Sequence, residues 1–381
     1  MKKVPELRFK EFNDEWKEEK LGDIGHFYKG KNISKEDLSN KGIECIRYGE
    51  LYTTYKEKID LVFNKTRLQL EKLFLSQKND ILIPSSGETA IDISTSSCIL
   101  KENVALGGDI TIIRTKNDGI FLAYYLNYLK KRDIAKLAQG ISIIHLYVNH
   151  LKSLKLKLPS RKEQQKIALF LSSIDKKIEL TDKKLEFLEK YKKWLMQKLL
   201  TGKVRFSGFK DEWKEEKLGN ISNIKKGEQL NKILQNSFDN YPVINGGVEI
   251  SGYTNKYNTN ENTISISEGG SCGHVKYMKT KFWSGGHCYA LEELEDSLNN
   301  EFLYHYLKFN EINLSRLKVG SGLPNIQKKA INNFIILVPP ILEQRKIASF
   351  LSAIDKKIEL IKSRLENLKR YKKGLLQKMF V

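Results

Sequence analysis

The chain has 381 residues, of which 40% are hydrophobic and 29% are charged, and its formal net charge is +20. This composition excludes a disordered or fibrous chain and fits two or three packed domains. No apolar run is long enough to span a bilayer, and the first residues, MKKVPELRFKEF, lack the apolar stretch of a signal peptide. Four widely spaced cysteines without a CxxC pair predict free thiols. We therefore expect a soluble protein of the cytoplasm.

The chain begins with a short leader that occurs twice. Its nine residues 14–22, DEWKEEKLG, recur without change at residues 211–219. A long region follows each copy, at about 15–158 and 212–338, and the two regions share an outline rather than a sequence. Strand-like runs occur at residues 80–84, 109–114 and 263–267, each near a turn residue. Both regions therefore predict mixed α/β domains.

The end of each long region follows the same order of elements. A helical stretch comes first, FLAYYLNYL at 121–129 and FLYHYLKF at 302–309. A glycine-containing loop follows, at 140–145 and 320–325, and then a final strand leads into Pro159 or Pro339. Proline is accepted at the start of a helix but not inside one, so both prolines predict helix starts.

The segments after the two prolines are near copies of one another. Residues 163–180 and 343–360 are identical at fifteen of eighteen positions, at an offset of 180. Apolar residues recur every three or four positions, which predicts a long helix with one apolar seam. The seam is broken by Thr181 and Lys192 in the first copy and by Lys372, the equivalent of Lys192, in the second. The first helix is expected from about Arg161 to Leu200, with Gly202 as its stop. At 1.5 Å per residue, some 38 residues span roughly 57 Å.

An amphipathic helix of this length needs a partner, and the other copy is the obvious one. If a two-fold axis relates two units that read a linear duplex, that axis is perpendicular to the duplex. Helices that hold the units apart run along the duplex and therefore cross the axis. A two-fold axis across the helices makes them antiparallel. The residues expected to pair them are Ile167, Leu171, Ile174, Ile178, Leu185, Leu188, Ile347, Leu351, Ile354, Ile358, Leu365 and Leu368.

The positive charge is concentrated in the repeated segments. The net charge is +6 for residues 1–158, +7 for 159–205, zero for 206–338 and +7 for 339–381. Such a distribution fits a polyanionic partner, although exposed helices are also commonly rich in lysine. With nucleic acid as the partner, the two variable regions should make unequal numbers of phosphate contacts.

The chain lacks the usual catalytic motifs. No Asp/Asn-Pro-Pro-Tyr tetrad of an amino-methyltransferase occurs, the nearest string being Val338-Pro-Pro-Ile341. Residues 25–31 almost form a phosphate loop, but Asn32 stands where Ser or Thr would hold magnesium. We therefore predict no catalytic residue and no cofactor in this chain.

Cys272 with His274, and His287 with Cys288, raise the alternative of a zinc site. Adjacent residues of a strand point to opposite faces, which disfavours a shared ion for His287 and Cys288. We expect packing cysteines and no metal.

Several Gly- and Ser-rich loops follow strands and could bring backbone close to DNA. Tight turns and core aromatics explain the same residues without any ligand. The DNA-binding candidates of the first region are Lys29, Lys31, Arg47, Tyr48, Ser85, Ser86, Gly87, Ser142 and His145. Those of the second region are Lys226, Asn245, Gly246, Gly270, Ser271, His274, Lys276, Ser321 and Asn325.

The doubled helix motif resembles the specificity (S) subunit of bacterial type I restriction-modification enzymes. The leader motif, Trp16-x4-Leu21-Gly22 and its copy at 213–219, also fits this family. The helix residues that carry the resemblance are Pro159, Glu163, Gln164, Ile167, Ala168, Phe170, Leu171, Ile174, Asp175, Ile178 and Lys193 to Lys198, with Pro339, Glu343, Gln344, Ile347, Ala348, Phe350, Leu351, Ile354, Asp355, Ile358 and Lys373 to Lys378 in the second copy.

The resemblance implies a non-catalytic DNA-recognition subunit in which each variable domain reads one half of a split target and the helices fix the spacer. Its partners would be double-stranded DNA, two methylation subunits that transfer methyl groups from S-adenosylmethionine to adenine N6, and two restriction subunits that use ATP and Mg. The protein would then be associated with the nucleoid. Apolar positions outside the seam are the expected docking surface, namely Phe170, Leu180, Phe187, Phe350 and Leu360.

The predicted fold class is α+β. Two mixed α/β target-recognition domains are joined by two long antiparallel coiled-coil helices in a pseudo-two-fold internal repeat. The predicted segments are a recognition domain at 1–158, a central long helix at 159–202, a second recognition domain at 203–338 and a C-terminal long helix at 339–381.

Two other functions are compatible with parts of the sequence. A stand-alone DNA-modifying enzyme with an unfamiliar site is one, and the missing motifs disfavour it. A coiled-coil scaffold without nucleic acid is the other, and two large divergent domains disfavour that.

Overall fold

The computed structural model describes residues 4–231, 235–236 and 240–381 and divides into two compact units. Unit 1 contains residues 1–181 and 364–381, and unit 2 contains residues 182–363. The last residues of the chain thus complete the unit that the first residues begin. Each long helix belongs partly to each unit, so the compact units do not coincide with the four predicted segments. The division of the chain into those four segments remains a prediction. Within the described ranges, no helix is long and apolar enough to cross a bilayer.

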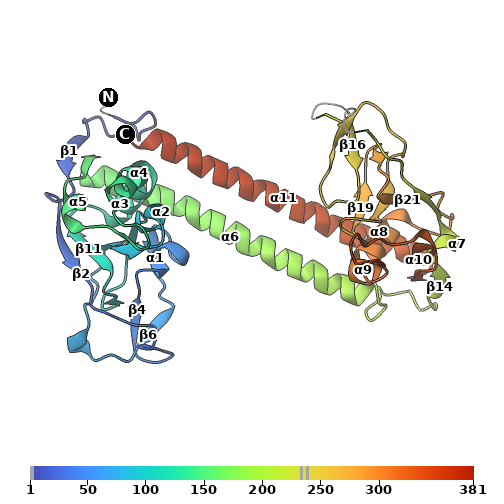
Figure 1. Ribbon diagram of the computed structural model, residues 1–381, viewed down its shortest axis with the longest axis horizontal. Coiled ribbons are helices and arrows are strands. Elements are labelled where there is room, and N and C mark those ends of the chain that lie inside the picture. The colour runs from blue at the N-terminus through green and yellow to red at the C-terminus, as the bar shows by residue number, and fades with distance from the viewer. Residues whose placement is uncertain (1–3, 232–234, 237–239) are drawn as a thin grey trace. The chain divides into compact units, whose positions relative to one another are not determined.

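Unit 1 is built around a five-stranded sheet with the order β2-β11-β7-β9-β5. A four-stranded sheet, β10-β4-β6-β3, lies beside it, and two-stranded sheets join β1 to β13 and β12 to β8 (Figure 1). The strands are β1 (Lys17–Lys20), β2 (Gly25–Lys29), β3 (Leu38–Ser39), β4 (Ile43–Ile46), β5 (Lys58–Ile59), β6 (Asn64–Thr66), β7 (Ile81–Pro84), β8 (Ser86–Gly87), β9 (Ser97–Ile99), β10 (Ala105–Leu106), β11 (Ile110–Thr115), β12 (Ile144–His145) and β13 (Lys155–Leu158).

Short helices complete unit 1. They are α1 (Glu50–Thr53), η1 (Leu70–Lys72), α2 (Ala90–Ile93), α3 (Gly119–Tyr125), the π-helical η2 (Leu126–Lys130), α4 (Lys131–Leu137) and α5 (Val148–Lys152). The predicted helix at 121–129 is therefore α3 continued by η2. Its side chains Phe121, Tyr124 and Tyr125 are buried, and they form one core with the β7 and β11 residues Ile81 and Ile113.

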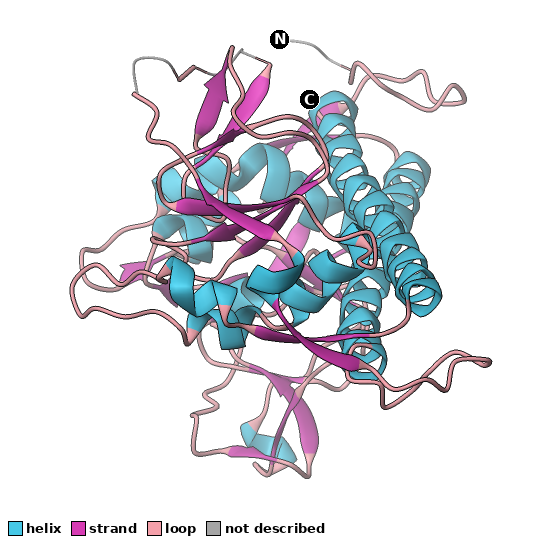
Figure 2. Cartoon of the chain, turned by 90° about the vertical axis from the view of Figure 1, so that its right-hand side faces the viewer, coloured by secondary structure: helices cyan, strands magenta, loops and turns pink. Residues whose placement is uncertain are grey.

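Unit 2 repeats this arrangement in outline. Its central sheet has the order β15-β21-β18-β19, and a three-stranded sheet, β17-β16-β20, accompanies it. The elements are β14 (Lys214–Lys217), α7 (Leu218–Ile221), β15 (Asn223–Lys226), β16 (Tyr241–Ile244), β17 (Gly252–Thr254), β18 (Thr263–Ser267), β19 (Val275–Met278), β20 (Trp283–Ser284), β21 (Cys288–Glu292), α8 (Asn300–Phe309), α9 (Glu311–Ser315), α10 (Lys328–Asn332) and β22 (Ile335–Val338). Figure 2 shows these helices and strands by colour. The strands and helices predicted in both variable regions are confirmed.

The two long helices are α6 (Arg161–Leu199) and α11 (Ile341–Met379), and they pair antiparallel in each unit. In unit 1, the beginning of α6 packs against the end of α11. Ile167, Leu171 and Ile174 share a core with Leu375 and Met379. In unit 2 the ends are exchanged, and the residues that share cores are Leu195, Leu199, Ile347 and Leu351, with Leu185, Leu188, Ile354, Ile358 and Ile361 further along.

The predicted seam residues all lie on the covered side of their helices. Most are buried, while Ile178, Leu185, Ile354 and Leu368 are half-buried. The helix stop also matches the expectation, because Gly202 takes a left-handed φ of 67° shortly after the end of α6.

The two lysines that break the seam are paired with aspartates. In unit 1, Lys372 Nζ lies 2.7 Å from Asp175, and in unit 2 Lys192 Nζ lies 2.5 Å from Asp355. Each pair is partly shielded from water, with the lysines 17% exposed. A single charged pair in an apolar seam disfavours other registers, since a slip of one turn leaves both charges unpaired in apolar surroundings.

A buried glutamate at the start of each long helix holds the leader, a name used from here on for residues 8–22 and 205–219. Glu163 is 1% exposed and accepts two hydrogen bonds of 2.8 Å from Arg8. In unit 2, Glu343 accepts bonds of 2.9 and 2.6 Å from Arg205 and a third from the Trp213 indole at 3.1 Å. A bidentate guanidinium–carboxylate pair fixes orientation as well as distance. The leader is thereby clamped to the first turn of the helix.

The neighbouring glutamine connects the helix to the recognition domain. Gln164 Nε2 donates to the Pro159 and Asn117 oxygens, and its Oε1 accepts from the Asp118 amide at 3.0 Å, just before α3. Gln344 makes the matching set with Pro339, Ser297 and Asn299 before α8. The Glu-Gln dipeptide of each repeat is therefore a structural joint, because it ties helix, leader and domain together.

A tyrosine in unit 1 and a histidine in unit 2 lie against the paired aspartates. The Tyr124 hydroxyl donates to Asp175 at 2.5 Å, whereas His305 Nε2 lies 3.1 Å from the Ser352 hydroxyl and Nδ1 lies 3.9 Å from Asp355. His305 is 1% exposed, and burial with the nearby Lys192 charge lowers its pKa to about 4. The imidazole is thus buried in its neutral form.

Removal of one partner of the seam ion pair should destabilise unit 2. We expect Asp355→Asn to lower the free energy of unfolding by about 1–2 kcal/mol, since it leaves Lys192 partly buried and unpaired. Urea unfolding followed by the hydrogen exchange of residues 182–199 measures this. The matched control is Asp60→Asn, whose exposed pair with Lys58 (2.9 Å) should be worth less than ~1 kcal/mol. Lys192→Met with Asp355→Leu should regain the loss, and a further loss would contradict the assignment.

Unit 2 should lose stability as the pH falls. The folded pKa of His305 is depressed, so its contribution is complete above the unfolded value of 6.5 and is lost as the pH falls towards about 4. Between pH 7 and pH 5 this amounts to about 2 kcal/mol. We expect His305→Gln to flatten this dependence in unfolding experiments, while His26→Gln, at an exposed histidine, should leave it unchanged. Equal pH dependence in all three proteins would refute this.

Candidate nucleic-acid interface

The central sheets of the two units end in the same tight crossing of backbones. The amide of Gly30 donates to the Ile110 carbonyl at 3.1 Å, and the amide of Gly227 donates to the Cys288 carbonyl at 2.9 Å. A Cβ atom on either glycine would lie about 2 Å from a carbonyl oxygen, 2.0 Å from that of Gly107 and 2.2 Å from that of Gly285. Only glycine permits this approach. The crossing brings the end of β2 or β15 onto the turn that precedes β11 or β21.

Matching hydrogen bonds then define equivalent positions around the crossing. Ser85 donates its amide to the Asp109 carbonyl and Glu268 to the His287 carbonyl, both at 2.8 Å. The turns that contribute these carbonyls are Gly107-Gly108-Asp109 and Gly285-Gly286-His287. The other equivalent pairs are Lys29 with Lys226, Arg47 with Asn245, Gly87 with Gly270, Thr111 with Tyr289, and His145 with Asn325, as the strand registers and backbone bonds show.

In unit 1, Asp109 is the centre of the site. Its carboxylate accepts a hydrogen bond of 3.0 Å from Ser86 and lies 4.0 Å from Lys29 Nζ. Ser86 pairs with His145 across β8 and β12, while the Ser85 hydroxyl is bonded to Thr111 at 2.8 Å. The structure therefore brings together five candidates predicted from separate parts of the sequence, Lys29, Ser85, Ser86, Gly87 and His145.

A second group of unit 1 candidates lies where β4 meets the Gly107 turn. The Gly107 amide donates to the Ile46 carbonyl, so the next two residues, Arg47 and Tyr48, lie beside the Gly107 turn. Arg47 Nε is 3.4 Å from Glu50, and Tyr48 is 38% exposed. Lys31 donates to the Glu71 carbonyl at 2.7 Å. The unit 1 surface is thus rich in cationic side chains.

In unit 2, a carboxylate replaces the serine of unit 1. Glu268 is 7% exposed and is bonded to Lys226 at 2.8 Å and to the Tyr289 hydroxyl at 3.1 Å. Burial raises the pKa of Tyr289 to about 12, so its hydroxyl stays protonated. The positive charge of Lys226 is partly balanced here, in contrast to the first unit.

Two left-handed glycine turns meet beside Glu268. Gly246 and Gly270 have φ values of 80° and 67°, and the Ser271 amide donates to the Gly246 carbonyl at 2.9 Å. Asn245 Oδ1 accepts from the His287 amide at 3.3 Å. The candidates Lys226, Asn245, Gly246, Gly270 and Ser271 therefore form one surface.

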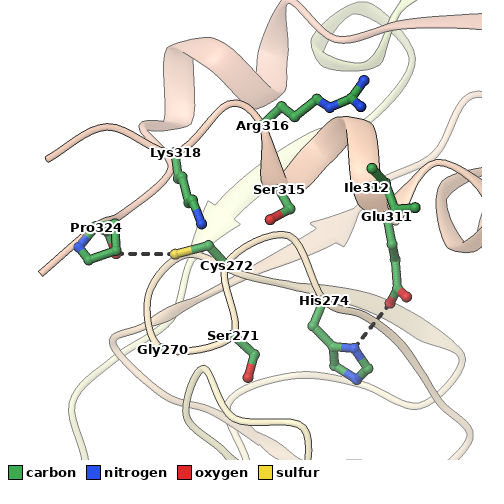
Figure 3. A pocket seen from close by; sticks show the side chains of 10 residues that line it. All are labelled: Gly270, Ser271, Cys272, His274, Glu311, Ile312, Ser315, Arg316, Lys318 and Pro324. Carbon is green, nitrogen blue, oxygen red and sulfur yellow. Dashed lines mark hydrogen bonds and ion pairs between the residues drawn. The ribbon is translucent and has the colours of Figure 1, made fainter. Parts of the chain in front are cut away.

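A pocket of about 550 Å³ in unit 2 adjoins these turns (Figure 3). His274 Nδ1 lies 3.0 Å from Glu311, and burial together with the Lys308 charge lowers the pKa of this histidine. Lys276, two residues further, donates to the Val248 carbonyl at 2.6 Å. Arg316 and Lys318 also line the pocket and are exposed. The pocket thus combines a histidine of lowered pKa with two exposed cations.

The last two candidates, Ser142 and Ser321, lie on exposed loops after α4 and α9. Both loops are closed by backbone hydrogen bonds, between Gln139 and His145 and between Val319 and Asn325. The closing residues His145 and Asn325 are also candidates, and they join the loops to the sites.

Asp109, His287 and Glu268 are site residues that the sequence patterns did not assign to DNA. The doubled Gly-Gly-X signal before β11 and β21 could have found the first two, since both copies stand before a strand. No repeated pattern marks Glu268, because the equivalent residue of unit 1 is Ser85.

Among residues 4–231, 235–236 and 240–381, no three His, Cys, Asp or Glu side chains gather as a metal site. The four cysteines are free thiols, and Cys288 accepts a hydrogen bond from the Gly246 amide at 3.0 Å. That this chain has no catalytic residue remains a prediction.

The predicted docking residues fall into two groups. Phe170 and Phe350 each pack edge-on against a leader phenylalanine, Phe9 at 5.7 Å and Phe206 at 5.8 Å. The clamped leader therefore covers part of the outer surface that the helix pattern predicts for partner subunits. The other three, Leu180, Phe187 and Leu360, are 55%, 65% and 70% exposed. A docking role for all five stays a prediction.

The sequence matches a protein family in both halves. The family model of the type I restriction modification DNA specificity domain matches residues 13–190 and 210–370. The chain is 25% identical to the MjaVIII specificity subunit of a Methanocaldococcus jannaschii type I restriction enzyme, over 97% of this chain and 94% of that one. It is 35% identical to a Mycoplasma pneumoniae protein named as a type I specificity subunit, a match that spans 44% of this chain and 45% of the relative.

Solved structures share the fold. The S subunit of a type I restriction-modification system from Mycoplasma genitalium superposes with a TM-score of 0.74, over 99% of both chains, and is 23% identical. A second solved chain, described in terms of complex assembly and conformational transition of the type I R-M system, has a TM-score of 0.55 and is 18% identical, over 97% of this chain and 98% of that one. The likeness in fold extends over both units, while the family model covers both halves of the sequence. The chain therefore belongs to the family of type I restriction-modification DNA specificity subunits.

Proposed function

We propose that each unit reads one half of a bipartite DNA target. The observation that carries this proposal is one backbone frame that presents different side chains in the two units. Arg47, Ser85 and Asp109 of unit 1 stand where unit 2 has Asn245, Glu268 and His287. Base edges in the major groove differ in donors and acceptors, so such exchanges change which base is bound. Because the two units carry different side chains at equivalent positions, we expect the two half-sites to differ in base sequence.

The long helices are proposed to set the spacer between the half-sites. Each has 39 residues and contributes to both units. At 1.5 Å per residue each spans about 58 Å. Half-sites on one face of a duplex lie ~34–36 Å apart, which helices of this length can bridge. The seam ion pairs would keep the spacer constant, because they oppose slippage.

The exposed stripe of α6 is proposed to bind methylation subunits. Phe187 stacks on Tyr191 at 6.0 Å, and Tyr191 stacks on Trp194 at 5.9 Å. Leu180 and Leu360 are further exposed apolar residues of the helices. In the complete enzyme we expect two methylation subunits, which use S-adenosylmethionine, and two restriction subunits, which use ATP and Mg.

The alternatives make different predictions for the purified chain. A stand-alone modifying enzyme would transfer methyl groups to DNA without a partner. A scaffold would show no shift of a mixed-sequence duplex in a gel, with or without a methylation subunit. The divergent site residues favour recognition over both alternatives.

Methylation mapping tests the proposed function. When this chain and its methylation subunit are expressed together, sequencing of the host DNA should show methylated adenines in a two-part motif with a fixed gap. Asn245→Arg gives unit 2 the side chain that unit 1 carries at the equivalent position, so it should alter one half of the motif and leave the other half and the gap unchanged.

The matched control for this substitution is Asn220→Arg, at an exposed residue of α7 before the other end of β15. It adds the same charge to unit 2 and should leave the whole motif as in the wild type. A single undivided motif, or methylation without this chain, would exclude the proposal.

Cationic side chains of unit 1 should contribute affinity without sequence preference. We expect Lys29→Ala with Lys31→Ala to weaken binding to every duplex by a similar factor and to reduce the slope of log K against log[salt] by about 2, because each phosphate contact releases counterions. Gel-shift titrations over a range of salt concentrations measure the slope. Lys10→Ala with Lys17→Ala, in the leader, is the matched control. A salt slope equal to that of the wild type would show that Lys29 and Lys31 do not contact phosphates.

A further inference from the structure

Two loops, one in each unit, have the same pattern of exposure. Residues 140–146 and 320–326 are each exposed at four positions, then half-buried, exposed and buried. Each loop begins with a left-handed glycine, Gly140 at φ 126° and Gly320 at φ 97°. The residue before each glycine, Gln139 or Val319, exchanges backbone hydrogen bonds of 2.7–3.0 Å in both directions with His145 or Asn325 of the loop. Both loops are thus short and closed by backbone bonds, and in the second loop the Cys272 thiol also donates to the Pro324 carbonyl at 3.1 Å.

A large aliphatic side chain projects from the same position of both loops. Ile143 is 59% exposed, and its equivalent Leu323 is 93% exposed. Ile141, in the first loop, is 98% exposed. A single exposed aliphatic residue needs no explanation. Here, however, two loops of different sequence keep one at the matched position, although Leu323 follows only serine and glycine residues in the second loop.

Both loops are anchored directly to the candidate sites. The residue that ends each loop is buried, Leu146 at 3% and Ile326 at 0%. Their amides donate to the Ser85 and Glu268 carbonyls, each at 2.9 Å. Each aliphatic tip therefore stands three residues before an anchor on the proposed DNA surface.

The surroundings of the tips favour an anionic partner. In unit 2, Pro324 lines the same pocket as Arg316 and Lys318 (Figure 3). In unit 1, His145 of the loop pairs with Ser86 of the Asp109 and Lys29 cluster. Each unit has one carboxylate here, and a lysine lies close to it, Lys29 at 4.0 Å from Asp109 and Lys308 at 2.6 Å from Glu311. An apolar tip beside cationic and hydroxyl groups fits a duplex, which offers phosphates outside and apolar base faces inside.

We propose that Ile143 and Leu323 are wedges that enter the duplex beside the two half-sites and unstack one base step each. This inference rests on the proposed function. The side chain leaves water for the apolar space between base pairs, while Ser142 and Ser321 can bond to the flanking phosphates. The closed loop holds the wedge in place. Because pyrimidine–purine steps unstack most easily, the wedge adds a preference at a step that no side chain reads.

Fluorescence of 2-aminopurine tests the wedge. The full chain with its methylation subunit is bound to duplexes that carry the mapped target, with 2-aminopurine placed in turn at each position in and beside the half-sites. Unstacking raises the fluorescence, so the wild type should give one wedge-dependent bright position at each half-site. Ile143→Ser should abolish this signal at one half-site and Leu323→Ser at the other, with binding weakened by about five- to tenfold.

The methylation subunit can brighten a position of its own, because an enzyme that modifies a base takes it out of the stack. That position is the methylated adenine, which the mapping identifies, and its signal should persist in both serine variants once the duplex is saturated. Leu61→Ser removes another exposed aliphatic side chain, 58% exposed, and should change no signal.

The outcomes separate this inference from the function on which it rests. Absence of any gel shift with the wild type would refute DNA recognition itself. Binding with no bright position other than the methylated adenine would refute the wedge alone. Loss of the methylation subunit from purified Ile143→Ser would also overturn the wedge, since the loop tips would then be protein contacts.

Discussion

The fold depends on the buried glutamate that opens each long helix. Glu163 and Glu343 are almost fully buried, and each is neutralised by one leader arginine held in a bidentate pair. A buried carboxylate without that partner would be strongly unfavourable, so the leader must return to the helix start in both units. The adjacent glutamine binds the backbone just before α3 or α8. Within each unit, one turn of helix therefore fixes the direction of the helix relative to the recognition domain.

The same backbone contacts hold the strand ends of both units, and so one backbone arrangement can present two different surfaces. The close crossings at Gly30 and Gly227 use backbone atoms alone, and so do the bonds that place Ser85 and Glu268. Side chains at the ends of the strands are consequently free to differ without loss of the frame. Recognition residues belong at such positions, because rigid strands hold them while the fold makes no demand on their identity.

The long helices, the doubled architecture and the main strands could be predicted because each leaves a periodic or repeated signal. The role of the two seam lysines could not, because their partners Asp175 and Asp355 are distant in sequence and become neighbours only in one antiparallel register. The cover over Phe170 was hidden for a similar reason, since the pattern of a helix cannot show that a leader packs on it. The site residues Asp109 and His287 lie in turns, where no periodicity marks a functional side chain.

The two sites differ in how far their charges are already balanced. In unit 2, Lys226 is bonded to the buried Glu268, and Lys308 is bonded to Glu311. In unit 1, Lys29 is 69% exposed and lies 4.0 Å from Asp109, and Lys31 is bonded to a neutral carbonyl. Charges balanced within the protein contribute less to phosphate binding, so the first unit should supply more of the affinity. The second unit, with its ordered network of donors and acceptors, is better suited to discriminate between bases, because a wrong base would leave buried polar groups unpaired.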